Sequence, residues 1–198
     1  MKARHIIESK QWQTQPFSDD LDATELLALG LSAANLGDLA LANQVVEKLQ
    51  SLLAARPGNV NLQLIHHEVA ALTLHKESMQ QSMVDVAKRQ QAIDLIQEAM
   101  TIKEGQRPPN GAATPLKPVH ELAAEMMLEM SKHDEAAQLF AVSLQRLPNR
   151  PWSLLGAARS HKGRNNVAEA SAMYGALLAV WSDDSHAAVR EAKQYLGY

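Results

Sequence analysis

Residues 120–144 read HELAAEMMLEMSKHDEAAQLFAVSL, and residues 154–178 read LLGAARSHKGRNNVAEASAMYGALL. A shift of 34 residues superimposes the two stretches and keeps small residues on small ones and aromatic residues on aromatic ones. The shared columns are Ala124 and Ala158, Ala136 and Ala170, Phe140 and Tyr174, and Leu144 and Leu178. Self-similarity at a fixed period of this length predicts a stack of similar units rather than one closed core.

The spacing of apolar residues predicts that each unit is helical. Apolar side chains recur at intervals of three and four residues, as at Leu26, Leu29 and Ala33. Aromatic residues make up only 4% of the chain, which is low for a sheet-rich protein. We therefore expect an all-α protein with helices at roughly 3–13, 21–35, 39–55, 60–76, 78–104, 118–131, 134–146, 151–162, 167–181 and 185–196.

The columns resemble those of the tetratricopeptide repeat (TPR), a helix hairpin with a period of 34 residues. Small residues let the first helix of a hairpin approach the second closely, and large ones fill the space toward the next hairpin. The resemblance implies a right-handed α-solenoid of antiparallel helix hairpins that ends in a capping helix. The residues of the repeat signature are Gly30, Ala42, Ala71, Ala92, Ala124, Ala136, Phe140, Pro148, Ala158, Ala170, Tyr174 and Ala192.

The repeat signature also predicts the boundaries of the units along the chain. Residues 21–198 are expected to form the TPR-like superhelix, and residues 1–20 a partial first hairpin. Two alternatives stay open for that hairpin: either the repeat is truncated because the chain is a piece of a longer protein, or a short first helix survives and residues 13–20 replace its partner. The expected repeats are about 23–58, 60–104, 117–150 and 151–184, with a cap at 185–196 and a proline-rich connector at 105–117.

Two segments of the array are irregular. Ala71 and Ala92 are 21 residues apart where the other repeats have twelve, which predicts a long second helix at roughly 78–104. The connector either spaces two sub-stacks or lies across the groove that the first helices line. The whole chain resembles the C-terminal part of larger bacterial TPR proteins of unassigned function, best at Pro108–Glu121 and Pro148–Ala158.

Catalytic and metal-binding motifs are incomplete. The chain has no cysteine, which excludes disulfides, zinc-thiolate sites and thiol catalysis. The segments that start at His67 and His120 begin like a zinc-protease helix, but Ala71 and Ala124 stand where the second histidine should be. No nucleophile elbow, phosphate loop or dinucleotide-binding glycine pattern is present. We therefore predict that the protein is not an enzyme and uses no metal or cofactor.

Charge and hydropathy limit the classes of partner. A net charge of -3 and a pI near 6.2 offer no positive field for nucleic acid or for an anionic lipid surface. No apolar run approaches the ~20 residues of a membrane span, and the start lacks the apolar core of a signal peptide. We expect a cytoplasmic protein with a protein or peptide ligand, and a periplasmic one if the chain comes from a secreted precursor. The sequence predicts neither the identity of the ligand nor the oligomeric state.

In TPR-like folds the first helices of successive hairpins line a groove. The glutamates of one groove helix place an acidic strip beside the basic Arg159 and Lys162 of the next, and the strip consists of Glu121, Glu125 and Glu129. This arrangement could orient an extended peptide by its charges. The alternative is internal, because Glu125 and Arg159 occupy equivalent columns one repeat apart and could form an ion pair. The candidate partner-binding residues are Glu68, His75, Glu121, Glu125, Glu129, Trp152, Leu155, Arg159 and Lys162.

Two hypotheses for the function follow. The first is a noncatalytic scaffold that binds a protein or peptide on the concave face of the stacked helix pairs. The second is a helical accessory segment of a larger enzyme, or of a secretion or assembly component, whose active part lies outside this chain. One binding mode is excluded: repeat proteins that clamp a C-terminal carboxylate use lysine and asparagine at groove positions that correspond here to the apolar Leu27 and Leu31.

Overall fold

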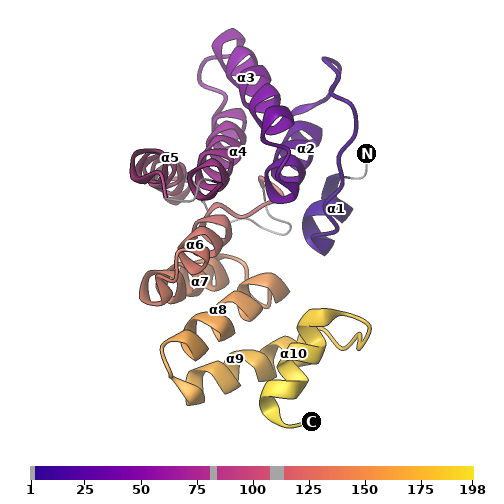
Figure 1. Cartoon of the computed structure of the whole chain (residues 1–198), viewed down its shortest axis with the longest axis vertical. Helices are drawn as coiled ribbons and strands as arrows, with labels where there is room; N and C mark the ends of the chain where they lie inside the picture. Colours follow the sequence, from indigo (N-terminus) through magenta and orange to yellow (C-terminus); the bar gives the residue numbers. More distant parts are fainter. Residues whose placement is uncertain (1–2, 81–83, 108–113) are drawn as a thin grey trace. The chain divides into compact units, whose positions relative to one another are not determined.

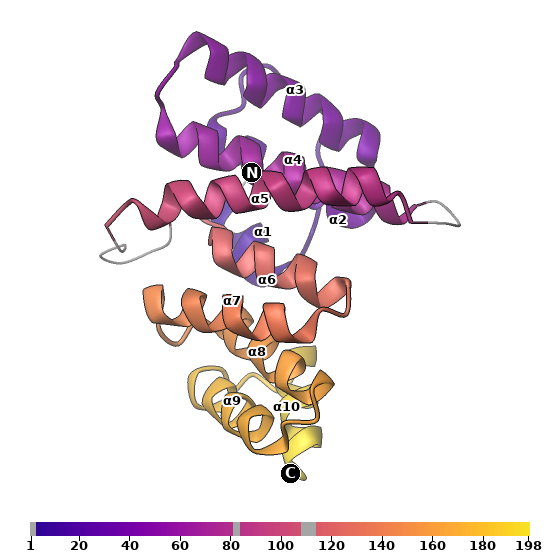
Figure 2. The same cartoon turned by 90° about the vertical axis from the view of Figure 1, so that its left-hand side faces the viewer.

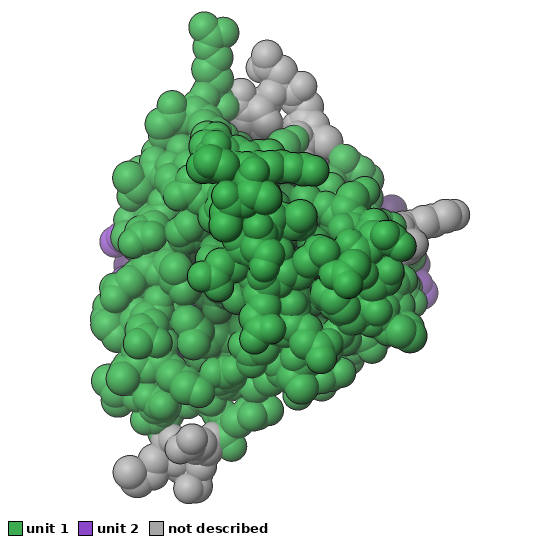
Figure 3. Space-filling view, turned by 90° about the horizontal axis from the view of Figure 1, so that it is seen from above, with its two compact units in different colours: residues 1–119 green, residues 120–198 purple. Residues whose placement is uncertain are grey.

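The computed structural model describes residues 3–80, 84–107 and 114–198, and every regular element in them is an α-helix. The chain divides into two compact units, residues 1–119 (unit 1) and residues 120–198 (unit 2) (Figure 3). The helices of unit 1 are α1 (Ala3–Ser9), α2 (Ala23–Leu36), α3 (Leu39–Ala55), α4 (Val60–Met79) and α5 (Val86–Glu104). The others are α6 (Val119–Glu129), which begins at the boundary, α7 (His133–Arg146), α8 (Pro151–Gly163), α9 (Val167–Val180) and α10 (Ala187–Leu196).

In unit 1 each helix packs against its neighbours along the chain (Figure 1). The helix α2 contacts α1, α3 and α4, and α4 also contacts α3 and α5. Asp22 caps the start of α2, because its carboxylate accepts hydrogen bonds from the backbone N–H groups of Thr24 and Glu25. Gly37 ends the helix in the left-handed conformation, with φ 82°, which glycine adopts without strain. Local sequence therefore sets both ends of α2.

Two glycines allow helices to approach closely. A Cβ atom on Gly30 of α2 would lie 3.1 Å from Cγ1 of Val45 and closer still to Cγ1 of Val69 on α4. A Cβ atom on Gly156 of α8 would lie 2.5 Å from Cε2 of Phe140 on α7 and closer still to Cζ. Ordinary contacts between carbon atoms are ~3.5–4.0 Å, so neither position has room for a side chain.

In unit 2, α8 contacts α7 and α9, and α9 contacts α10. The capping helix α10 buries Ala188 and Ala192 in a cluster that includes Tyr174 and Leu177 of α9. The all-helical hairpin architecture expected from the repeat is confirmed.

The second hairpin differs from the expectation. The long helix expected at 78–104 begins only at Val86, because α4 continues to Met79 and Asp85 caps α5 by accepting a hydrogen bond from the backbone N–H of Lys88. The helices α4 and α5 lie side by side (Figure 2). They have 20 and 19 residues, whereas α2 and α3 have 14 and 17. The extra residues of this repeat therefore lengthen both helices and the turn between them, in which residues 81–83 lie outside the described part.

Unit 1 contains non-helical stretches after α1 and after α5. The helix expected at 3–13 ends at Ser9, because Lys10 takes a left-handed backbone conformation with φ 54°. Residues 11–22 contain no helix or strand. In the connector expected at 105–117, residues 108–113 lie outside the described part, and the segment that starts at Thr114 belongs to unit 1.

Candidate functional site

The candidate partner-binding residues fall into two groups by exposure. The buried ones are Glu68 and His75 on α4, Glu121 on α6, and Trp152 and Leu155 on α8. Glu125 is half-buried, and Glu129, Arg159 and Lys162 are exposed. The accessible charged residues among the candidates therefore all lie in unit 2.

Glu121 lies in the interior of unit 2. Its carboxylate accepts hydrogen bonds from Nε of Arg150 and from the hydroxyl of Ser153, both at 2.6 Å. The Glu121 side chain is 0% exposed and that of Arg150 is 9% exposed. The Ser153 hydroxyl also lies 2.9 Å from that of Ser143 on α7. This buried ion pair ties α6 to the first turn of α8.

Arg159 pairs with the capping helix. Its Nε donates to Oε1 of Glu191 on α10 at 3.0 Å, and its Nη2 donates to Oε2. The hydroxyl of Tyr174 donates to the same carboxylate at 2.7 Å. Burial acts to raise the pKa of Glu191, but the hydrogen bonds from Arg159 and Tyr174 and the charge of Arg159 hold this pKa below its ordinary value. Glu191 is therefore ionised at neutral pH and orients the Arg159 side chain.

Lys162 and Tyr195 extend this arrangement. Lys162 follows Arg159 by three residues on α8, and its Nζ lies 5.5 Å from the centre of the Tyr195 ring, within range of a cation–π interaction. The rings of Tyr195 and Tyr174 pack with their centres 4.7 Å apart. We call Arg159, Lys162, Tyr174, Glu191 and Tyr195 the α8–α10 cluster. These five residues include two cations and one carboxylate.

Glu125 and Glu129 lie four residues apart on α6 and therefore on the same side of that helix. The hydrogen bond from Arg159 to Glu191 is the largest effect that raises the pKa of Arg159, and the charge of Glu125 adds to it. The internal alternative placed the partner of Arg159 one repeat before it, at Glu125. The structure also pairs Arg159 with Glu191 on α10, the helix that follows the last hairpin.

Trp152 belongs to an aromatic cluster. Its ring meets that of Trp181 edge-on at 5.2 Å, and Trp181 packs on His186 with the ring centres 4.0 Å apart. Nδ1 of His186 accepts a hydrogen bond from the backbone N–H of Ala188 and so caps α10. The cluster joins the start of α8 to the start of α10, and Trp152 is mainly buried within it.

A pocket of about 320 Å³ opens in unit 1. Its walls come from α1, from the first turns of α2 and α4, and from the end of the connector. The residues that line it are Arg4, Thr24, Leu27, Asn61, Ile65, Thr114, Pro115 and Leu116. The pocket thus combines polar side chains at its rim with apolar ones on the first helices of two hairpins.

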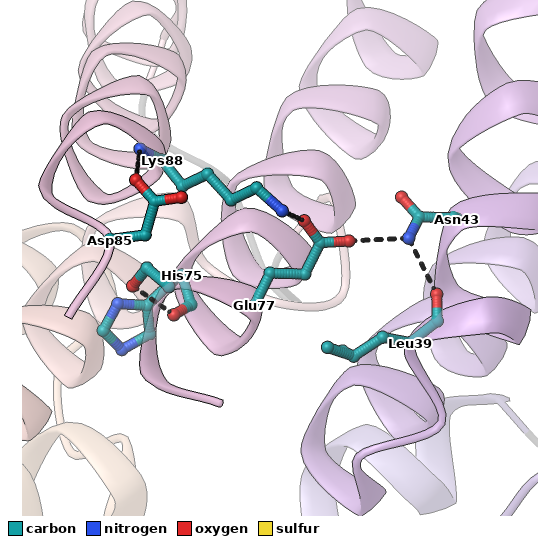
Figure 4. A network of polar contacts seen from close by, with 7 residues as sticks. Leu39, Asn43, His75, Glu77, Asp85 and Lys88 are labelled. Atoms are coloured by element: carbon teal, nitrogen blue, oxygen red, sulfur yellow. Dashed lines mark hydrogen bonds and ion pairs between the residues drawn. The ribbon is translucent and has the colours of Figure 1, made fainter. Parts of the chain in front are cut away.

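A polar network joins three helices of unit 1 near the end of α4 (Figure 4). The Glu77 carboxylate accepts hydrogen bonds from Nδ2 of Asn43 on α3 and from Nζ of Lys88 on α5, both at 2.7 Å. Burial acts to raise the pKa of Glu77, but these hydrogen bonds and the charge of Lys88 lower it. Both oxygens of the Glu77 carboxylate accept hydrogen bonds within unit 1. The network therefore stabilises the packing of the hairpins and is not a candidate binding site.

Sequence reasoning missed Glu191 and the role of Tyr195. The sequence predicted only a cap at 185–196, but Glu191 within it is half-buried and bound to Arg159. A signal was present, because Arg159 and Glu191 are separated by 32 residues, close to one repeat period, and carry opposite charges.

The described residues contain no group of three or more His, Asp or Glu side chains arranged to hold a metal ion. In the same residues, no helix is both long enough and apolar enough to cross a membrane.

The comparisons with known proteins identify the fold. No protein-family model matches the chain, and no curated protein does either. Among solved structures, a thermophilic TPR protein of Thermus thermophilus is similar, with 18% sequence identity and a TM-score of 0.65. The match covers 98% of this chain and 87% of that one. The chain therefore has the fold of a TPR protein, an α-solenoid of helix hairpins.

Proposed function

We propose that the protein is a noncatalytic scaffold and that unit 2 binds an extended segment of a partner protein. TPR-like folds commonly bind proteins, and the fold supplies a row of first helices on which such a segment can lie. The observation that carries the proposal is the α8–α10 cluster, where an ordered arginine and an exposed lysine lie on one face of α8.

The cluster suits an acidic group of the ligand. A guanidinium has five N–H donors, and Arg159 directs Nε and Nη2 toward Glu191. The Arg159 side chain is 47% exposed, so its outer edge can donate to a second carboxylate. Lys162 supplies a second cation that Tyr195 holds in place. Because Glu191 already orders the guanidinium, a ligand loses less side-chain entropy on binding.

Glu125 and Glu129 provide the opposite charge. Glu125 is half-buried and Glu129 is exposed, and two carboxylates on one side of α6 favour a basic residue of the ligand beside them. A segment with an acidic residue toward α8 and a basic residue toward α6 would match both helices. Charge complementarity of this kind sets the orientation of a bound peptide more than its affinity.

A peptide selection tests the proposal. A phage-displayed library of random peptides is selected on the intact chain, and we expect acidic residues to be enriched. Lys162→Gln should weaken the selected peptides by about tenfold, which corresponds to ~1.4 kcal/mol. This substitution leaves the ion pair between Arg159 and Glu191 intact. Glu125→Lys with Glu129→Lys should abolish the preference for a basic residue in the same peptides.

The matched control places the same charge changes on the second helices. Glu135 on α7 and Glu169 on α9 are both exposed, so Glu135→Lys with Glu169→Lys alters the net charge by the same amount away from the proposed surface. Selected peptides should bind this control like the unaltered chain. The proposal fails if no peptide is enriched, or if Lys162→Gln and the control bind the peptides equally well.

A further inference from the structure

The end of the connector lies in unit 1 against the first helices of two hairpins. Thr114, Pro115 and Leu116 line the 320 Å³ pocket together with Leu27 of α2 and Ile65 of α4. Figure 1 shows this segment, drawn in pink, beside α2 and α4. It therefore lies against α2 and α4, which are first helices of their hairpins, as α6 and α8 are in the surface proposed for unit 2.

Specific contacts hold this segment. Nζ of Lys103, in the last turn of α5, donates a hydrogen bond to the backbone carbonyl of Thr114 at 2.6 Å. Pro115 is buried and Leu116 is half-buried. A backbone carbonyl bound by a side chain, with apolar side chains inserted beside it, is how an extended peptide is usually held.

The space left beside the segment has the composition of a peptide site. Arg4 and Asn61 are exposed and Thr24 is half-buried. All three can donate or accept hydrogen bonds at the rim, and Leu27 and Ile65 form apolar walls. A volume of about 320 Å³ is at the lower end of the range for ligand pockets. The pocket is therefore an open cavity of ligand size beside the end of the connector.

We propose that residues 114–116 act as an internal ligand of unit 1, and that the same site takes an extended partner segment of similar chemistry, with a proline followed by an aliphatic residue. The partner must displace the internal segment. Since the internal segment is tethered, its effective concentration is in the millimolar range, and the apparent affinity for the partner falls by the fraction of molecules in which the site is open. This inference rests on the proposed function for its premise that first helices bind peptides, but it concerns a separate site.

A peptide added in trans tests the inference. The probe is a fluorescein-labelled peptide with the sequence of residues 112–119, AATPLKPV, and its binding to the full-length chain is followed by fluorescence anisotropy. In the variant Pro115→Gly with Leu116→Ser the internal segment loses its apolar side chains. We expect this variant to bind the probe at least tenfold more tightly than the unaltered chain. Lys103→Gln, which removes the hydrogen bond to the Thr114 carbonyl, should give a smaller gain.

Two controls locate the binding. Asn61 is exposed, so Asn61→Trp fills the pocket without changing the core, and it should abolish binding of the probe when added to the double variant. A scrambled probe with the same composition should not bind. Circular dichroism before each titration establishes that the variants are folded.

Each outcome decides one claim. Equal affinity of the unaltered chain and the double variant would overturn the inference, as would probe binding that survives Asn61→Trp. Absence of binding to a folded double variant would overturn it too. Lys162→Gln lies in unit 2 and should not alter binding of this probe, so failure of the inference and failure of the unit 2 surface are measured separately.

Discussion

Replacement of Gly156 by alanine tests whether close approach of α7 and α8 holds unit 2 together. The new Cβ would lie 2.5 Å from Cε2 of Phe140, about 1 Å inside an ordinary contact, and nearer still to Cζ. Phe140 is 0% exposed, so its ring has no solvent side into which it can move. Overpacking of this kind costs ~1–3 kcal/mol, and the higher helix propensity of alanine returns ~1 kcal/mol. Because the overlap is about 1 Å and the ring cannot move, the cost lies in the upper part of that range, so we expect a net loss of about 1–2 kcal/mol in the free energy of unfolding, measured by urea denaturation.

Two companion variants make the test specific. Gly175 lies within α9, and no atom lies within 4 Å of the position that a Cβ atom would take there. Gly175→Ala should therefore stabilise the protein by about 1 kcal/mol. Phe140→Leu removes the ring atoms that the new methyl group meets. Gly156→Ala should therefore be neutral or stabilising in that background, and the double-mutant cycle gives the coupling energy. Equal effects of Gly156→Ala in both backgrounds, or no loss in the unaltered background, would refute the packing argument.

Two further predictions concern the ion pairs of unit 2. Glu191→Gln should destabilise the protein at pH 7: the folded pKa of Glu191 is lowered, so its contribution is present above the ordinary value of 4.5 and is lost as pH falls through the folded pKa. Urea titrations at pH 7 and pH 3 should show the difference from the unaltered chain shrink, and a constant difference would contradict the assigned cause. Arg150→Ala should cost about 3 kcal/mol, because it removes a charged donor from the buried Glu121 carboxylate. Arg164→Ala breaks an exposed pair with Asp134 and should cost under ~1 kcal/mol. Similar losses for the two arginine variants would count against the buried pair.

The repeat columns predicted the helices because they record a local steric requirement. Where two helices touch, a small residue must stand at one place in each unit, and Ala124, Ala158 and Ala192 satisfy that requirement at one period. All three are fully buried in the structure. A packing rule that recurs along the chain is visible in the sequence without knowledge of the third dimension.

The start of α5 was harder to predict because two local signals compete. Met79, Met83 and Val86 continue a near-heptad apolar spacing, which favours an uninterrupted helix. Asp85 is a single capping residue within that run, and the structure uses it to begin the helix at Val86. An apolar periodicity is judged over many residues, so one capping residue within the run does not change the prediction of a continuous helix.

The sequence could predict only which repeat positions the candidate site residues occupy, not how their side chains pair. Glu121 and Glu125 lie one turn apart on α6, but one is buried and the other half-buried. The difference comes from Arg150 and Ser153, which reach Glu121 from the start of α8. Likewise, the partner of Arg159 depends on which carboxylate its side chain can reach. Side-chain pairing across hairpins is a tertiary property, and a linear pattern does not contain it.

Arg159 belongs both to the packing of the last helix and to the exposed surface of α8. An anion that binds the outer edge of its guanidinium keeps the Arg159 side chain in the position where it contacts Glu191, and α10 would then open less often and exchange its amide protons more slowly. By thermodynamic linkage, anything that stabilises α10 in its packed position strengthens the binding of that anion to Arg159 by the same factor. The packing of α10 and the binding of an anion at Arg159 are therefore thermodynamically coupled.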